Sequence, residues 1–310
     1  MNTAIFVYIT AFVFLLSLGF TSQAQDYYVE LDVSSGYNNN VFLESDDTVI
    51  NQETEDSSKQ DIQNQISLMG SYEFFDGQDS DAKIMLDYFK ESLLDNSLDT
   101  TVTSVSIPFT YYINDYRLRS SAALMNYDLD GVHVLDYQTG RFDVTRKMGD
   151  TSSGEKRLGA QISYTQKIPQ DESYDAYDGT TQSLKVHYTV TDLASMFKLD
   201  GNVFENDYVL EEDGSQGYYL KAIYSKRFLK SGMRLLAKYK KTNYNLSLLD
   251  DEVRNDDQFT LSYTQEYFLN NIIQLYLSTE FIENNSSIET DDENYNYSQW
   301  TNTMGVRFSF

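Results

Sequence analysis

The 310-residue chain has no cysteine, two prolines and two histidines. Without cysteine it can form neither a disulfide framework nor a thiolate metal site, and two histidines are too few for a histidine-rich metal site. We therefore expect no metal centre and no cofactor. Proline is the residue that most often interrupts a β-sheet, so its near absence permits long unbroken strands.

Long apolar runs are also scarce. One such run, Ala4–Phe20, lies at the N-terminus and carries no charge. It is followed by Ser22-Gln23-Ala24, which is typical of a signal-peptide cleavage site, although no Lys or Arg precedes the run. We predict that residues 1–24 are a cleaved signal peptide and that residues 25–310 form the mature protein. An uncleaved membrane anchor is the alternative, but about 17 apolar residues is the short limit for a spanning helix.

Positive charge is scarce as well, because 23 Lys and Arg face 48 Asp and Glu, which gives a net charge of −25. A protein this acidic is repelled by nucleic acid, so we expect no nucleic-acid partner. The acidic residues gather between strand-like segments, as in Glu44–Asp56 and Glu289–Glu293. The segment Asp128–Gly131 resembles the start of a calcium loop but lacks the terminal glutamate, which favours solvated loops over a defined calcium site.

Alternation of apolar and polar residues, by contrast, is abundant. In the segment 158–165, apolar residues occupy the even positions and polar or small residues the odd ones. Period-two alternation predicts a strand with one apolar and one polar face. The chain contains fourteen strand-like segments, each about 10–14 residues long and able to cross a bilayer at a tilt. The segment Val134–Met148 alternates poorly, and we predict a β-bulge near Gly140 that restores its pattern.

The connections between these segments form two sets. One set is short, as in Asp76–Asp79 and Asn114-Asp115, and the other is longer and acidic, as in Asn38–Gln60 and Asp128–His133. Aromatic residues cluster near the short set, as expected for an interfacial girdle: Tyr72, Phe74, Phe109, Tyr111, Tyr116, Phe197, Tyr224, Phe228, Phe268, Phe308 and Phe310. A large soluble β-sandwich would share the alternation but does not need strands this long. We predict an all-β fold, a single antiparallel transmembrane β-barrel of about 14 strands with short turns at one end and long acidic loops at the other.

Two short motifs resemble those of Gram-negative outer membrane β-barrel proteins, including porins. The segment Gly36–Phe42 (GYNNNVF) is similar to the end of the first strand in many of these barrels, among them the barrel halves of surface lipoprotein assembly modifiers. The chain ends on Val306-x-Phe308-x-Phe310, which resembles the signal read by the barrel-assembly machinery. The resemblance implies a location in the outer membrane of a Gram-negative bacterium, with the short turns in the periplasm. It also implies contacts with that machinery, with lipid and with lipopolysaccharide.

The parity of the strands predicts which charged residues face the barrel interior. The candidate pore-lining residues are Lys83, Arg117, Arg119, Arg157, Lys221, Arg234, Lys238 and Lys240. Like charges this dense would be prohibitive in a dry core, so we predict a wet lumen. A row of Arg and Lys would favour anions at a constriction, whereas solvated charges paired across strands would need no function. Where the first and last strands meet, we expect Glu30, Asp32 and Arg307 to face the lumen, with Arg307 near one of the two carboxylates.

The function predicted from these features is a passive, porin-like channel for small polar or charged solutes. The alternative is a non-conducting structural or surface-interaction barrel whose acidic loops bind a partner, as in adhesins or lipoprotein assembly. The helical repeat domain of the assembly modifiers has no counterpart here, so lipoprotein export does not follow. A hydrolase at the rim, built on His133 with Asp128 and Asp136, is a third class. No nucleophile motif accompanies it, and we predict no enzymatic activity. The oligomeric state does not follow from the sequence.

Overall fold

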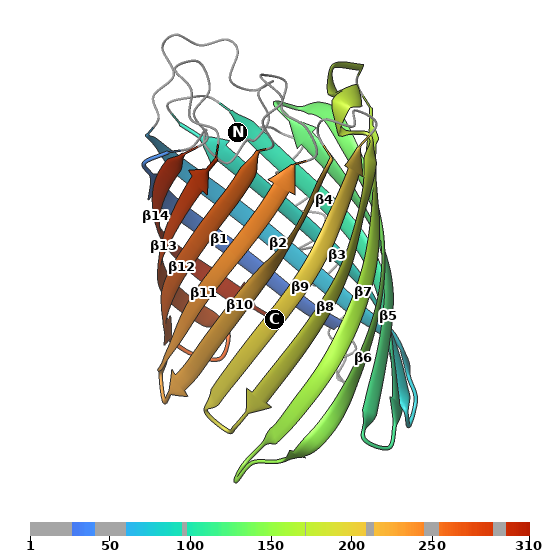
Figure 1. Ribbon diagram of the computed structural model, residues 1–310. Coiled ribbons are helices and arrows are strands. Elements are labelled where there is room, and N and C mark those ends of the chain that lie inside the picture. The colour runs from blue at the N-terminus through green and yellow to red at the C-terminus, as the bar shows by residue number, and fades with distance from the viewer. Residues whose placement is uncertain are drawn as a thin grey trace.

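The computed structural model describes residues 27–40, 60–94, 98–170, 172–208, 214–244, 254–287 and 296–310. These residues form fourteen β-strands and one short 3-10 segment, η2 (Glu172–Tyr177). Each strand pairs with the next in sequence and β14 pairs with β1, so the sheet closes into a barrel (Figure 1). The predicted antiparallel 14-strand barrel is therefore confirmed. The predicted signal peptide lies outside the described residues, as do Val41 and Phe42 of the first-strand motif.

The strands run from one end of the barrel to the other. Their bounds are β1 (Tyr27–Asn38), β2 (Asp61–Asp76), β3 (Ser80–Leu93), β4 (Asp99–Ile113), β5 (Tyr116–Leu129), β6 (Val132–Asp150), β7 (Glu155–Pro169), β8 (Gly179–Thr191), β9 (Ser195–Tyr208), β10 (Ser215–Phe228), β11 (Ser231–Tyr244), β12 (Asn255–Phe268), β13 (Ile273–Ser286) and β14 (Tyr297–Ser309). The shortest, β1, has 12 residues. At about 3.3 Å per residue and a tilt of about 40°, it spans about 30 Å along the barrel axis, the thickness of a hydrocarbon core.

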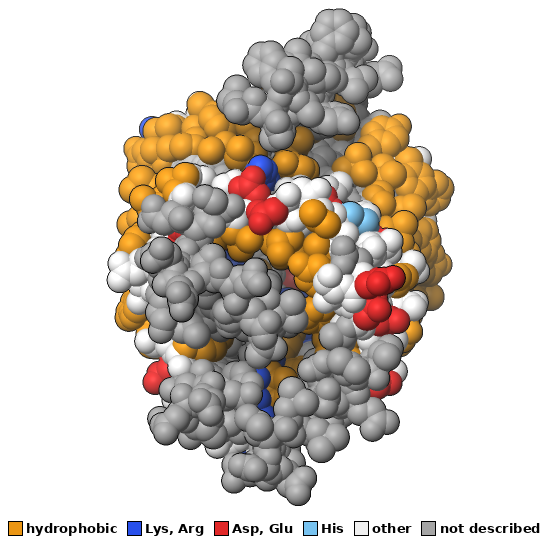
Figure 2. All heavy atoms as spheres, turned by 90° about the horizontal axis from the view of Figure 1, so that it is seen from above, with side chains coloured by type: hydrophobic (Ala, Val, Ile, Leu, Met, Phe, Trp, Pro, Cys, Tyr) orange, Lys and Arg blue, Asp and Glu red, His pale blue; other side chains and the backbone are white. Residues whose placement is uncertain are grey.

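The two faces of the sheet differ in polarity. Large apolar side chains on the outward face stay exposed in the middle of the strands, as shown by Leu86 (54%), Ile162 (57%) and Leu220 (55%). Exposing such a side chain to water costs about 1.5–3 kcal/mol, so this face suits lipid. Figure 2 shows apolar side chains around the circumference of the barrel. The described part contains no helix long and apolar enough to cross a membrane.

The closing seam is hydrogen-bonded along its length. In the register of β1 and β14, Asp32 lies opposite Arg307 and Val33 opposite Val306. The amide of Val29 donates to the carbonyl of Phe310 (3.1 Å), and the amide of Phe310 donates back (2.8 Å). The seam therefore leaves no unpaired edge along these strands.

The connections at the two ends of the barrel differ in length, with one exception to the prediction. At the lower end in Figure 1, β4 and β5 are joined by Asn114-Asp115, with a positive φ of 52° at Asn114. The predicted long connections within residues 41–59, 209–213, 245–253 and 288–295 lie outside the described residues. The predicted long loop Asp128–His133 at the opposite end is wrong, because β5 and β6 meet through the two-residue turn Asp130-Gly131. Both turn residues have positive φ (49° and 79°), the conformation that a tight hairpin requires.

The predicted bulge near Gly140 is also wrong. Gly140 pairs in register with Ala122 and Tyr164. The register instead shifts at the two ends of β6, where Val134 and Met148 are the extra residues. Between these two residues the parity of β6 is constant, but its outward face carries Asp136, Gln138 and Arg146 while Leu135 and Tyr137 face inward, so the alternation of apolar and polar residues is regular only over Arg141–Thr145.

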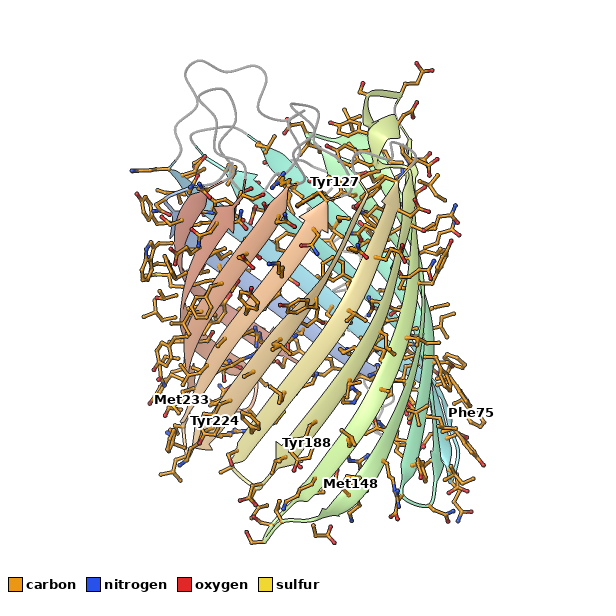
Figure 3. The ribbon with its side chains drawn as sticks, viewed as in Figure 1. Phe75, Tyr127, Met148, Tyr188, Tyr224 and Met233 are labelled. Carbon is orange, nitrogen blue, oxygen red and sulfur yellow. The ribbon has the colours of Figure 1, made fainter. Side chains whose placement is uncertain are left out.

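The aromatic residues near the short turns lie mainly on the outward face. Figure 3 places Phe75, Tyr188 and Tyr224 at this end of the barrel. The predicted girdle residue Phe268 is an exception, because it pairs in register with inward-facing Gln274. The guanidinium of Arg227 lies 4.3 Å from the centre of its ring. Phe268 therefore belongs to the mouth of the lumen and not to the lipid face.

Candidate functional site: the charged lumen

The charged residues that face the lumen separate largely by sign, with Asp143, Glu155 and Asp200 as acids among the bases, and Lys83 and Arg307 as bases among the acids. The strand registers place these basic residues on the inward faces of β5 to β11, here called the basic wall: Arg117, Arg119, Arg141, Arg157, Lys185, Lys198, Lys221, Arg234, Lys238 and Lys240. They place these carboxylates on the inward faces of β12 to β14 and β1 to β3, here called the acidic wall: Glu266, Glu280, Glu30, Asp32, Glu73, Asp87 and Glu91. Because the strands follow one another around the barrel, the two walls are opposite halves of the lumen.

The predicted pore-lining residues all lie on inward faces, in three different surroundings. Lys83 is on the acidic wall, and its ammonium lies 3.5 Å from the carboxylate of Glu73. Arg117, Arg119 and Arg157 line one cavity of the basic wall. The other four are on β10 and β11: Lys221, Arg234, Lys238 and Lys240. The part that these residues play in conduction stays a prediction.

Two lysines on the basic wall face each other directly. Lys221 and Lys238 are register partners on β10 and β11. The ring of Tyr219 lies beneath both ammonium groups, at 5.9 Å and 5.5 Å from its centre. The carboxylate of Asp200, which is 1% exposed, lies 3.4 Å from Lys221 and also 3.4 Å from Lys198. Asp200 thus holds two cations that would otherwise repel each other.

The closing residues form a compact cluster on the acidic wall. The Nε atom of Arg307 lies 3.0 Å from Asp32 and 3.3 Å from Glu30. The hydroxyl of Tyr276, on β13, donates to Asp32 across β14 (2.6 Å). This reach depends on Gly305, because a Cβ there would lie 2.5 Å from the Tyr276 hydroxyl oxygen. The cluster joins three neighbouring strands at the seam.

A buried cluster on the basic wall has the composition of a catalytic triad but not its hydrogen-bond arrangement. Thr145 donates to Asp143 (2.7 Å), and its hydroxyl lies 3.3 Å from Nε2 of His187. The Nδ1 atom of His187 lies 3.6 Å from Asp143. Thr145 is only 1% exposed and its hydroxyl donates to Asp143 rather than to His187, which is not the arrangement of an activated nucleophile. As at the seam, these contacts run along the wall, across Gly159 on the intervening strand, and not across the lumen.

A cavity of about 480 Å³ opens on the basic wall. Its charged lining residues are Arg117, Arg119, Arg141, Asp143, Glu155, Arg157, Lys185 and Lys198. Arg141 and Asp143 were not among the predicted lumen residues, because the alternation of β6 is weak. The available signal was the apolar pair Phe142 and Val144, which fixes the outward face of this strand.

A smaller cavity of about 280 Å³ lies on the acidic wall and is lined mainly by amides, hydroxyls and the carboxylates of Glu91 and Glu280. The side-chain amide of Gln65 donates to Glu91 (2.6 Å). Nearby, Gln299 donates to Asn38 (3.0 Å), which ties β14 to β1 at the end away from the short turns. This cavity therefore offers oxygen acceptors, in contrast to the cationic one.

The alternative rim site around His133 is a surface cluster. His133 lies 2.8 Å from Asp128 and 3.1 Å from Asp136, on the outward side of β5 and β6. The extra residue Val134 turns His133 away from the lumen. Nowhere in the described ranges do three or more His, Asp or Glu side chains form a group that could hold a metal ion.

Comparisons with known proteins show a fold and no family. No protein-family model and no curated protein matches the chain. The structure is similar to a loop-deletion mutant of OmpT, an outer membrane protein of Vibrio cholerae, with a TM-score of 0.52 and 8% identity over 92% of this chain and 98% of that one. It is also similar to CdiB from Acinetobacter baumannii, with a TM-score of 0.50 and 11% identity. That alignment covers 93% of this chain but only 61% of the CdiB chain. An anion-selective porin from Comamonas acidovorans gives a TM-score of 0.48 and 11% identity over 92% of this chain and 98% of that one. The chain has the fold of bacterial outer membrane β-barrels, and similarity to lipoprotein assembly modifiers is not shown.

Proposed function

We propose that the protein is a passive, porin-like channel of the outer membrane that admits small polar or charged solutes. The observation that carries the proposal is the contrast between the two faces of the closed sheet. The outward face exposes large apolar side chains, whereas the inward face carries charges that separate into a basic and an acidic wall. This is the polarity of a water-filled barrel in lipid.

Electrostatics supports a wet lumen. Desolvating a charged side chain costs several kcal/mol unless it is paired, and Arg119 and Arg141 are exposed to the lumen with no ion-pair partner among the described residues. Water is the solvent that makes these cations tolerable. An eight-stranded barrel is filled by its own side chains, and the interior widens with strand number. The hydrogen bonds of Tyr276 with Asp32 and of His187 with Thr145 run along the wall and not across the lumen, which is consistent with an open passage.

The location and partners follow from the same polarity. The outward face would contact membrane lipid and lipopolysaccharide, and Phe310 is 50% exposed on this face. Val306, Phe308 and Phe310 would present the terminal signal to the barrel-assembly machinery. We propose no catalytic activity, since the hydroxyl in the cluster with triad composition donates to Asp143 rather than to His187.

A planar-bilayer recording tests the channel. The purified protein should insert and give discrete, ohmic conductance steps in KCl. Protein that folds, as judged by circular dichroism, and yet gives no steps would contradict the proposal. That result would favour the non-conducting structural or surface-interaction barrel.

A further inference from the structure

We infer that the cavity of the basic wall is a binding site for small organic anions that carry two or more carboxylate or phosphate groups. The inference rests on the proposed channel function for solute access to the lumen. It concerns a discrete site with its own affinity, which is a stronger claim than a general preference for anions.

The charge balance of the cavity is the first argument. Six basic residues line it against two carboxylates, in a chain whose net charge is −25. Both carboxylates already have partners, because Glu155 pairs with Arg157 and Asp143 accepts from Thr145. Positive charge in the cavity therefore exceeds what its own acids can neutralise.

The second argument is the state of the arginines. Arg119 and Arg141 expose their side chains to the lumen, and neither forms an ion pair or hydrogen bond within the described residues. Arg117 reaches Thr145 at 3.5 Å, and its Nε is buried without a hydrogen-bond partner among the described residues. A guanidinium fork matches carboxylate and phosphate oxygens in a bidentate arrangement. The guanidinium groups of Arg119 and Arg141 are thus available to a ligand rather than committed to the wall.

Register brings the two exposed arginines close together. Arg119 lies opposite Asp143, and Arg141 lies opposite Ser121, one inward-facing position further along the same pair of strands. Diagonal neighbours of this kind are about 7–8 Å apart, within reach of long side chains. Lys185 lines the same cavity from β8, two strands further round. One ligand with two or three anionic groups can therefore engage cations from several strands.

The volume of the cavity limits the size of the ligands that it can bind. At about 480 Å³, it falls within the range of about 300–1,000 Å³ of small-molecule sites. It is larger than a single hydrated inorganic anion needs, and a neutral solute would leave the cations without partners. A small polycarboxylate or organic phosphate meets both conditions.

The test compares citrate and fructose 1,6-bisphosphate, one probe for each anionic group, in current block and in calorimetry of the detergent-solubilised protein. Both probes should bind, and glucose should not. In the double variant Arg119→Gln/Arg141→Gln, affinity should fall at least tenfold. The double variant Arg119→Lys/Arg141→Lys keeps the charge without the fork and should give an intermediate affinity. The control is Lys156→Gln/Lys226→Gln, which removes the same charge from outward-facing positions near the short turns and should bind like the parent.

Failure of the site and failure of the channel give different results. If the parent protein conducts KCl but binds neither probe, the proposed binding site is overturned and the proposed channel function is retained. A parent that binds both probes in calorimetry without conducting supports the site and overturns the channel. Equal weakening in the Arg119/Arg141 and Lys156/Lys226 glutamine variants would mean that overall charge alone attracts the anions, and the site would be overturned.

Discussion

Replacing Asp200 with asparagine should destabilise the barrel more than the same change at a lumen carboxylate that has no ion pair. Asp200 is 1% exposed, and its carboxylate lies 3.4 Å from the ammonium groups of Lys198 and Lys221. At this distance and an effective dielectric constant of about 20, each pair is worth about 5 kcal/mol before desolvation is subtracted. The lysines keep 30% and 27% of their side-chain exposure, so solvent screens part of this energy. Since breaking a buried pair costs about 3–5 kcal/mol, we expect a loss of about 2–4 kcal/mol.

Equilibrium urea unfolding in lipid vesicles measures this loss. Trp300, the single tryptophan of the chain, lies on the outward face with its ring centre 4.6 Å from that of Phe281, so its fluorescence reports removal from lipid. The matched control is Asp87→Asn on the acidic wall, where Asp87 accepts from Ser104 and has no ion-pair partner in the described part of the chain. The control should cost less than about 1.5 kcal/mol. If both variants lose the same stability, Asp200 does not hold the lysines together, and the reasoning is refuted.

Two further outcomes follow from the geometry of the walls. Gly305→Ala should lower the free energy of unfolding by about 1–3 kcal/mol in the same assay, because its Cβ would collide with Tyr276. The control Gly140→Ala places its Cβ in open space and should be nearly neutral. Equal effects of the two changes would contradict the role of Gly305. Arg234→Gln/Lys238→Gln should lower the anion-to-cation permeability ratio, as measured by reversal potentials in a salt gradient, and a ratio equal to that of the parent would remove these two side chains from the conduction path.

The sequence predicts the barrel well because its physics is local. Period-two alternation fixes which residues of each strand face lipid, and short connections force neighbouring strands to pair. The same local rule fails where a residue is inserted. Val134 and Met148 each shift the parity of β6 near its ends, and no alternation rule marks an insertion at the end of a strand. In this region the predicted loop Asp128–His133 was wrong, because β5 and β6 continue to the two-residue turn at Asp130-Gly131.

The lumen chemistry is predictable in part. Parity alone brings Lys221, Arg234 and Lys238 to the inward face, and the consecutive strand order then places them on one half of the barrel. Parity does not say which cations have partners. Asp200 engages Lys221 because β9 and β10 pair in one particular register, whereas Arg119 lies opposite Asp143 without forming an ion pair. The availability of a charge depends on side-chain conformation, which the pattern of residue types does not encode.

The separation of charge between the walls makes selectivity and affinity different observables. A reversal potential reflects every charge near the path, so the acidic wall should offset the basic wall, and we expect a small net preference between anions and cations. Binding in the cavity depends on a few arginines within contact distance, where screening by salt is weaker than across open water. A barrel with a weak permeability preference can therefore still bind a polyanion tightly, and current block, rather than ion selectivity, is the measurement that reports on Arg119 and Arg141.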